Sequence, residues 1–161
     1  MARAEPARAS ASSADVTDPW AGTDLDIYRS NYVSLMRRIR ALLAQDDLLL
    51  TDLKALHFLQ SGTTRPTALA AALDLTPAAG TQILDRFERR GLARRTPDPL
   101  DRRATIVRLT PVGHRQYELA AGRVRKLVVS LASGMSRDGL DALRRGSEEL
   151  GRVLAEVTPG A

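Results

Sequence analysis

The chain has 161 residues, a formal net charge of +5 and no cysteine. At this length one domain is the ordinary expectation, and without cysteine the chain forms neither a disulfide nor a zinc–thiolate site. No apolar run reaches the ~18 residues of a transmembrane helix, and the N-terminus lacks the pattern of a secretory signal. We therefore expect a cytoplasmic protein that does not contact a membrane.

Positive charge is concentrated in one stretch. Between Asp85 and Arg108 there are eight arginines against four acidic residues. Such a concentration suggests a polyanion as partner, although a merely solvated basic surface is the alternative. The motifs around these arginines decide between the two interpretations.

The first half of the chain predicts a tail and two helices. Residues 1–22 are rich in Ala, Ser and Arg without a period, which predicts a flexible N-terminal tail. Apolar residues at three- and four-residue steps predict a long helix over 24–45. After a buried lead-in at 48–50, Thr51 is expected to cap a second helix that stops at Ser61 and Gly62. A short strand after Gly62 could pair with a later hairpin.

The next two predicted helices are short and joined by a tight turn. The third begins at Pro66 and stops near Asp74, and Thr76 with Pro77 opens the fourth. The buried face of the fourth helix comprises Gly80, Ile83, Leu84 and Phe87. Its outer face comprises Ala78, Gln82, Asp85 and Arg89, flanked by Thr81 and Arg86. Two such helices are typical of a helix-turn-helix.

A β-hairpin is predicted directly after the fourth helix. Residues 92–95 form its first strand, 96–101 a tip rich in Pro and Asp, and 105–109 a β-branched return strand. Thr110 and Pro111 then open a fifth helix over 111–131. A hairpin with arginines at its tip behind a helix-turn-helix is what a DNA-binding wing requires.

Two long helices are expected to close the chain. In the fifth, the helical spacing of apolar residues predicts core positions at Leu119, Val124, Leu127, Val128 and Leu131. Ser136 is expected to cap the sixth, whose apolar side contains Leu140, Leu143, Leu150, Val153 and Leu154.

The stretch LTPAAGTQILDRFERRGLARRTPDPLDRRATIVRLTPVGHRQY resembles the MarR family of bacterial transcriptional regulators, above all in DPLDRR followed by IVRLTPVG. The resemblance is detailed over 48–113 and extends in helical order over 24–157. It implies a mainly α fold with a winged helix-turn-helix at 48–110 and a small β-hairpin wing. Long helices at 23–47 and 111–157 would form the dimerisation region. Asp74 stands where the family more often has Gly, and Asp tolerates a left-handed conformation.

The resemblance also implies a function. A homodimer would bind a pseudo-palindromic operator in double-stranded DNA, with the recognition helix in the major groove and the wing at the minor groove. It would act as a repressor modulated by a small aromatic or anionic effector. An activator, a ligand-independent regulator or a protein-interaction (anti-repressor) module with the same fold are the alternatives. Without cysteine, the thiol-sensing branch of the family is excluded.

Candidate DNA-binding residues follow from side-chain chemistry. Ala78, Thr81 and Gln82 can reach base edges, while contact with phosphates alone remains the alternative. Pro77 opens this helix, and Arg86 and Arg89 fit phosphate clamps. In the wing, the candidates are Arg94, Arg95, Asp101, Arg102 and Arg103. We expect Arg102 or Arg103 to enter the minor groove while Asp101 pairs with the other. Arg94 and Arg95 could contact DNA or pair with Asp85 and Glu88.

Other chemistry finds little support in the sequence. His57 and His114 fall on different predicted helices and are interpreted as structural, so we expect no metal and no cofactor. Tyr28, Tyr32 and Phe58 either line an effector pocket or belong to the core. Because no nucleophile–base arrangement, phosphate loop or paired carboxylates can be argued, we expect no enzymatic activity.

Overall fold

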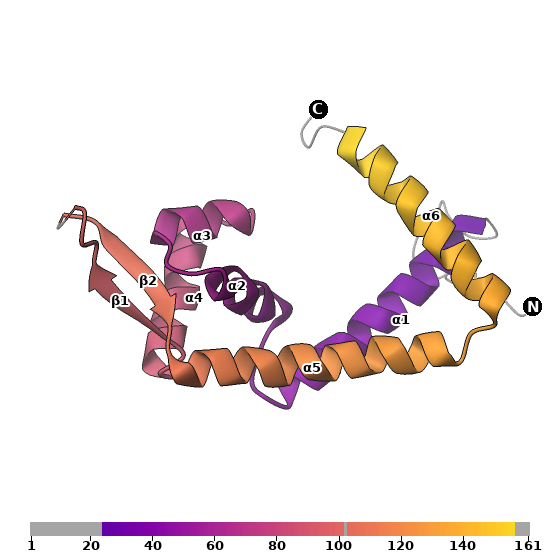
Figure 1. Ribbon diagram of the computed structural model, residues 1–161, viewed down its shortest axis with the longest axis horizontal. Coiled ribbons are helices and arrows are strands. Elements are labelled where there is room, and N and C mark those ends of the chain that lie inside the picture. Colours follow the sequence, from indigo (N-terminus) through magenta and orange to yellow (C-terminus); the bar gives the residue numbers. More distant parts are fainter. Residues whose placement is uncertain (1–23, 102, 157–161) are drawn as a thin grey trace, which may run out of the picture. The chain divides into compact units, whose positions relative to one another are not determined.

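The computed structural model describes residues 24–101 and 103–156. The predicted tail at 1–22 and Arg102 lie outside these residues. Figure 1 shows the elements, which are α1 (Asp24–Ala44), α2 (Leu50–Gln60), α3 (Pro66–Ala72), α4 (Pro77–Arg89), β1 (Ala93–Pro97), β2 (Thr105–Leu109), α5 (Pro111–Ser133) and α6 (Arg137–Glu156). The expected fold class, mainly α with one β-hairpin, is confirmed.

The chain falls into two compact units, residues 1–38 and 39–161. In the first unit the described residues are the N-terminal part of α1. There the rings of Tyr28 and Tyr32 stack with centroids 6.5 Å apart, and both side chains are exposed. Among the described residues, no helix is long and apolar enough to cross a membrane.

The core of the second unit lies where α2, α3, α4 and the hairpin meet. Its largest fully buried apolar side chains include Leu56, Leu59, Leu69, Leu84, Phe87 and Val107. The four predicted inward residues of α4, from Gly80 to Phe87, are all buried. Burial of one face leaves the opposite face of α4 in solvent, which fixes the residues available to a partner.

The turn between α3 and α4 has the predicted chemistry. Asp74 adopts a left-handed φ of 53°, and the Thr76 hydroxyl accepts a hydrogen bond from the Ala79 amide at 3.2 Å. Pro77 occupies the first turn of α4. A Cβ on Gly80 would lie 2.8 Å from the Ala70 Cβ, so the absence of a side chain lets the two helices approach closely.

The hairpin is antiparallel and pairs Ala93 with Leu109 through Pro97 with Thr105. The return strand is as predicted, but β1 continues two residues beyond the expected end at Arg95, because cross-strand pairing reaches Pro97 and the Asp98 amide still donates to the Ala104 oxygen. The short strand expected after Gly62 is a single bridge, in which Thr64 and Val107 exchange backbone hydrogen bonds of 3.0 and 2.7 Å.

The start of α2 corrects the sequence prediction. The helix begins at Leu50, with Leu49 as its N-cap, so Thr51 lies inside it. The reason is Asp52, whose carboxylate accepts a hydrogen bond from the Leu49 amide at 2.8 Å. The lead-in is buried only at Leu48, since Leu49 is 62% exposed.

The predicted cores of α5 and α6 are also corrected. Leu119, Val128 and Leu131 of α5 are exposed, and α6 has no buried residue although Ser136 caps it as predicted. The N-terminal half of α5 packs on α2, where Ala120 is buried. The helical periodicity of the apolar residues was therefore a sound basis for the helices but not for burial within one chain.

Candidate nucleic-acid interface

The outer face of α4 carries small and polar side chains near its N-terminus. Ala78, Thr81 and Gln82 are exposed, as is Pro77 at the helix start. Within the described residues, neither the Thr81 hydroxyl nor the Gln82 amide is engaged by a protein group. A Gln amide can donate and accept toward adenine, and Ala and Thr methyl groups fit a thymine methyl. The fold therefore leaves these groups available to an external partner.

Arg86, on the same helix, is turned inward. Its guanidinium forms an ion pair with the carboxylate of Asp52, whose side chain is 1% exposed. The same carboxylate caps α2, so Arg86 ties α4 to the start of α2. Arg89 is exposed, and its Nε lies 3.4 Å from the backbone oxygen of Asp85. Of the two expected phosphate clamps, Arg89 is the more available.

Arg95 joins the hairpin to α4. Its Nη1 lies 2.7 Å from an Asp85 oxygen and 2.5 Å from a Glu88 oxygen, and its amide donates to Glu88 at 2.9 Å. Burial works to lower the pKa of the Arg95 guanidinium, but the two carboxylates outweigh burial and raise it. Arg95 therefore takes the ion-pairing alternative, whereas Arg94 is exposed and makes no ion pair within the described residues.

Arg90 and Arg123 hold the turn after α1. The Arg90 guanidinium donates to the backbone oxygens of Asp46 and Asp47, at 2.8 and 2.5 Å, and Arg123 of α5 pairs with the Asp46 carboxylate. Thus fewer arginines of the basic stretch are available to a partner than the sequence suggests, because protein groups bind the guanidinium groups of Arg86, Arg90 and Arg95.

Several hydrogen bonds join the described residues of the wing tip. Asp98 donates its amide to the Ala104 oxygen at 2.9 Å, and its carboxylate accepts the Leu100 amide at 2.9 Å and lies 3.4 Å from Arg65. The Leu100 hydrogen bond, assisted by Arg65, lowers the pKa of the Asp98 carboxyl group. These bonds fix the tip relative to the N-terminus of α3.

Asp101 acts on the backbone at this tip. Its carboxylate accepts the Arg103 amide at 3.0 Å rather than the Arg103 guanidinium. Arg103 is exposed, so its charge is free to enter a groove. The predicted choice between Arg102 and Arg103 stays open, because Arg102 lies outside the described residues.

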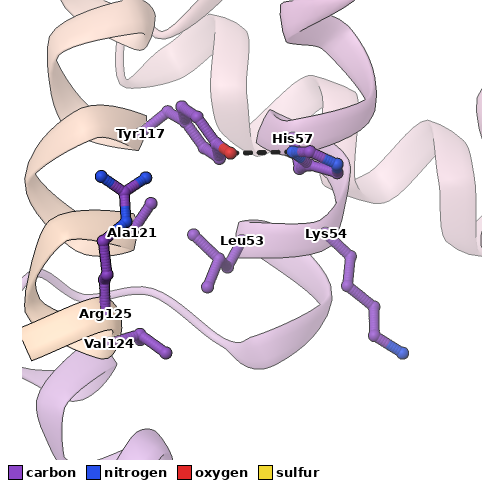
Figure 2. Close-up of a pocket in the computed structure, with 7 residues that line it drawn as sticks. All are labelled: Leu53, Lys54, His57, Tyr117, Ala121, Val124 and Arg125. Carbon is purple, nitrogen blue, oxygen red and sulfur yellow. Dashed lines mark hydrogen bonds between the residues drawn. The ribbon is translucent and has the colours of Figure 1, made fainter. Parts of the chain in front are cut away.

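A hollow of about 340 Å³ lies between α2 and α5. Figure 2 shows its lining, which comprises Leu53, Lys54, His57, Tyr117, Ala121, Val124 and Arg125. The Tyr117 hydroxyl and the Nδ1 of His57 lie 2.8 Å apart across one end of it. The walls are apolar, and two cationic side chains lie at its edge.

The predicted effector residues are not among those that line this hollow. Tyr28 and Tyr32 belong to the first unit, and Phe58 is half-buried on α2 without lining this hollow. No sequence motif marks the hollow, because its residues come from two helices about sixty positions apart. The role of Tyr28, Tyr32 and Phe58 in an effector pocket stays a prediction.

The two histidines have protein partners. His57 contacts Tyr117, and the Nδ1 of His114 contacts the Gln60 side-chain oxygen. Gln60 in turn donates to Glu118 at 3.1 Å, which adds a third polar link between α2 and α5. Across residues 24–101 and 103–156, no group of three or more His, Cys, Asp or Glu could hold a metal ion.

Known proteins share this arrangement. Residues 46–104 match the MarR family. YhbI of Bacillus subtilis, an uncharacterized HTH-type transcriptional regulator, is 36% identical over 86 residues, or 53% of this chain and 56% of YhbI. The match thus spans little more than half the length of that relative.

Solved structures show the same fold. A variant of Staphylococcus aureus MepR superimposes with a TM-score of 0.76 at 20% identity, covering 82% of this chain and 98% of MepR. A variant of Escherichia coli MarR in complex with operator DNA has a TM-score of 0.62 at 23% identity, covering 78% and 91%.

Proposed function

We propose that the chain is a transcriptional regulator of the MarR kind, and that it acts as a homodimeric repressor that binds a pseudo-palindromic operator. The observation that carries the proposal is the outer face of α4. Ala78, Thr81 and Gln82 are exposed beside Arg89, and each can contact a base edge or phosphate without unfolding anything. A DNA-binding regulator acts in the cytoplasm, where bacterial DNA lies.

The wing supplies the second contact. Arg103 presents an exposed charge at a tip where Asp98 and Asp101 accept hydrogen bonds from the Leu100 and Arg103 amides. A narrow minor groove has an enhanced negative potential, so an inserted guanidinium is stabilised there. Recognition helix and wing together would span a major groove and the adjoining minor groove.

Dimerisation follows from the unburied apolar side of α6. Its exposed large apolar side chains are Leu140, Leu143, Leu150, Val153 and Leu154. A contiguous apolar face of this kind marks an interaction site, and a two-fold copy would cover it. Two-fold symmetry would then place the recognition helices ~34 Å apart, one DNA turn.

The hollow between α2 and α5 suits a small aromatic acid as effector. Leu53, Ala121 and Val124 offer apolar walls, and Lys54 with Arg125 offers charge for a carboxylate. Such a ligand would weaken operator binding only if it prefers the form that does not fit DNA. Tyr28, Tyr32 and Phe58 remain the alternative lining.

The proposal is tested by fluorescence anisotropy with promoter DNA from the protein's own locus and with a scrambled duplex of equal length. We expect specific binding at least ~10³-fold tighter than to the scrambled duplex, with log K falling steeply as log salt rises. Equal affinity for both duplexes would contradict an operator-binding function. A promoter–reporter assay then separates repression from activation, and titration with benzoate or salicylate tests release by an aromatic acid.

Should neither duplex bind, size-exclusion chromatography with purified regulators from the same locus would examine the anti-repressor alternative.

A further inference from the structure

Two arginines face each other across the hairpin. In the register of the sheet Arg94 of β1 is paired directly with Arg108 of β2, and both side chains are exposed. Directly opposite residues in an antiparallel pair have Cβ atoms about 5 Å apart, and like charges there are destabilising. The neighbouring pair, Ala93 with Leu109, is buried, so the arginine pair lies on the outer face of the hairpin.

Three carboxylates of α4 and the hairpin already take part in ion pairs with other arginines. Asp85 and Glu88 pair with Arg95, and Asp98 pairs with Arg65. Within the described residues, neither Arg94 nor Arg108 makes an ion pair or a side-chain hydrogen bond. The two charges therefore repel each other without compensation from the protein itself.

An external anion would remove this repulsion. A phosphate accepts several hydrogen bonds from guanidinium groups, often in a bidentate manner, and two adjacent arginines can share one or two phosphate oxygens. The repulsion between the two arginines in the free protein is then offset by their attraction to the phosphate in the complex. A phosphate of the DNA backbone is the natural source, because the pair lies on the same hairpin as the exposed Arg103.

We propose that Arg94 and Arg108 form a phosphate clamp on the outer face of the wing, which holds the DNA backbone beside the groove that the tip enters. This inference rests on the proposed operator binding. It adds Arg108 to the interface, and it gives the pair a positioning role without base readout, because phosphate contacts carry no sequence information directly.

The clamp predicts that stability and DNA affinity change in opposite directions. In Arg108→Glu the new carboxylate faces Arg94, so the like-charge pair becomes a cross-strand ion pair. We expect the melting temperature of the free protein to rise by about 1–4 °C, and operator affinity at ~0.15 M salt to fall by at least about tenfold. The two quantities are measured by thermal unfolding and by anisotropy on the same preparations.

Neutral variants test the salt dependence. Each phosphate contact contributes about 0.9 to the slope of log K against log salt. Because both protomers of the dimer carry the substitution, we expect Arg108→Gln to lower the slope by about 2 and the Arg94→Gln/Arg108→Gln pair by about 4, with the preference for operator over scrambled duplex unchanged. Arg145→Gln is the matched control, since Arg145 is an exposed arginine on α6.

The outcomes separate this inference from the proposed function. If the parent protein does not prefer the operator, the proposed function is wrong and the clamp falls with it. If the parent binds and Arg103→Ala weakens binding while the Arg94 and Arg108 variants keep the parental slope, only the clamp is overturned. A fall in both stability and affinity for Arg108→Glu would assign Arg108 a structural role and also overturn it. The clamp would also be overturned if the Arg94 and Arg108 variants lost regulation in cells but kept their DNA affinity, because that result would indicate a protein partner.

Discussion

Asp52 is the single charged side chain that is buried within the described residues. Its carboxylate satisfies the first free amide of α2 at Leu49 and the guanidinium of Arg86 on α4. A buried carboxylate needs such partners, because desolvation of an unpaired charge costs several kcal/mol. One residue therefore closes a helix start and fixes the orientation of the recognition helix.

The two sides of this ion pair should respond unequally to substitution. Asp52→Asn keeps an oxygen for the Leu49 amide and leaves the half-exposed Arg86 free to reach water, so we expect a loss of about 1 kcal/mol in the free energy of unfolding. Arg86→Leu leaves a buried, uncompensated carboxylate, and we expect a loss of about 3 kcal/mol. Urea denaturation of both variants at neutral pH gives the comparison.

Arg89→Leu on the exposed side of α4 is the matched control and should change stability by less than about 0.5 kcal/mol. An equal or smaller effect of Arg86→Leu than of Asp52→Asn would show that the carboxylate is not dependent on Arg86.

At the scale of single elements, local chemistry was sufficient wherever the signal lies within a few residues. Thr76 with Pro77 predicted the start of α4, and Thr110 with Pro111 that of α5, because capping is decided by the next three residues. The cap predicted at Thr51 is wrong, because the side chain of Asp52 accepts a hydrogen bond from the Leu49 amide and starts the helix earlier.

Contacts between distant residues were beyond the sequence. Arg86 looked like a phosphate ligand because its partner Asp52 lies 34 residues away, and nothing in either motif marks the pair. His57 and Tyr117, 60 residues apart, are a similar case. Exposure of Ala78 and Gln82, in contrast, could be predicted, because the opposite face of α4 has a clear apolar period.

The contact between α3 and α4 depends on Gly80, and this gives an element-scale prediction. In Gly80→Ala the new methyl would lie 2.8 Å from the Ala70 Cβ, so the helices must separate, at a cost of about 1–3 kcal/mol. We expect lower operator affinity as well, because the angle of α4 to the rest of the unit changes. Removing the opposing methyl in Gly80→Ala/Ala70→Gly should restore stability to within about 1 kcal/mol of the parent.

A double-mutant cycle by chemical denaturation measures this coupling, with Ala70→Gly alone as the third corner. Additive effects in the cycle would mean that the two residues do not meet.

At the scale of the whole molecule, the buried side chains of residues 24–101 and 103–156 gather mainly around the winged helix. Leu119, Val128 and Leu131 of α5 continue the helical period of a packed face yet are exposed, and α6 buries nothing. The sequence predicted the apolar faces correctly but could not show whether the same chain or a second one covers them. This division between a self-sufficient winged helix and uncovered long helices is what a homodimer would use.

The last prediction concerns that assembly. Leu143 is 55% exposed on the apolar side of α6, so Leu143→Glu places a charge in the proposed dimer interface and leaves the winged helix untouched. We expect sedimentation to show monomer at micromolar concentration. Operator affinity should fall by about 10²-fold or more, because the second half-site is no longer bound by a linked recognition helix.

Arg145→Glu, two residues along the same helix, is the control and should remain dimeric. The secondary structure of both variants is followed by circular dichroism, since loss of α6 itself would mimic dissociation. If Leu143→Glu stays dimeric and binds the operator as the parent does, α6 does not hold the dimer together, and the symmetric spacing of the recognition helices must come from other surfaces. If it becomes monomeric with full affinity, a single winged helix suffices for binding, and the pseudo-palindromic operator is wrong.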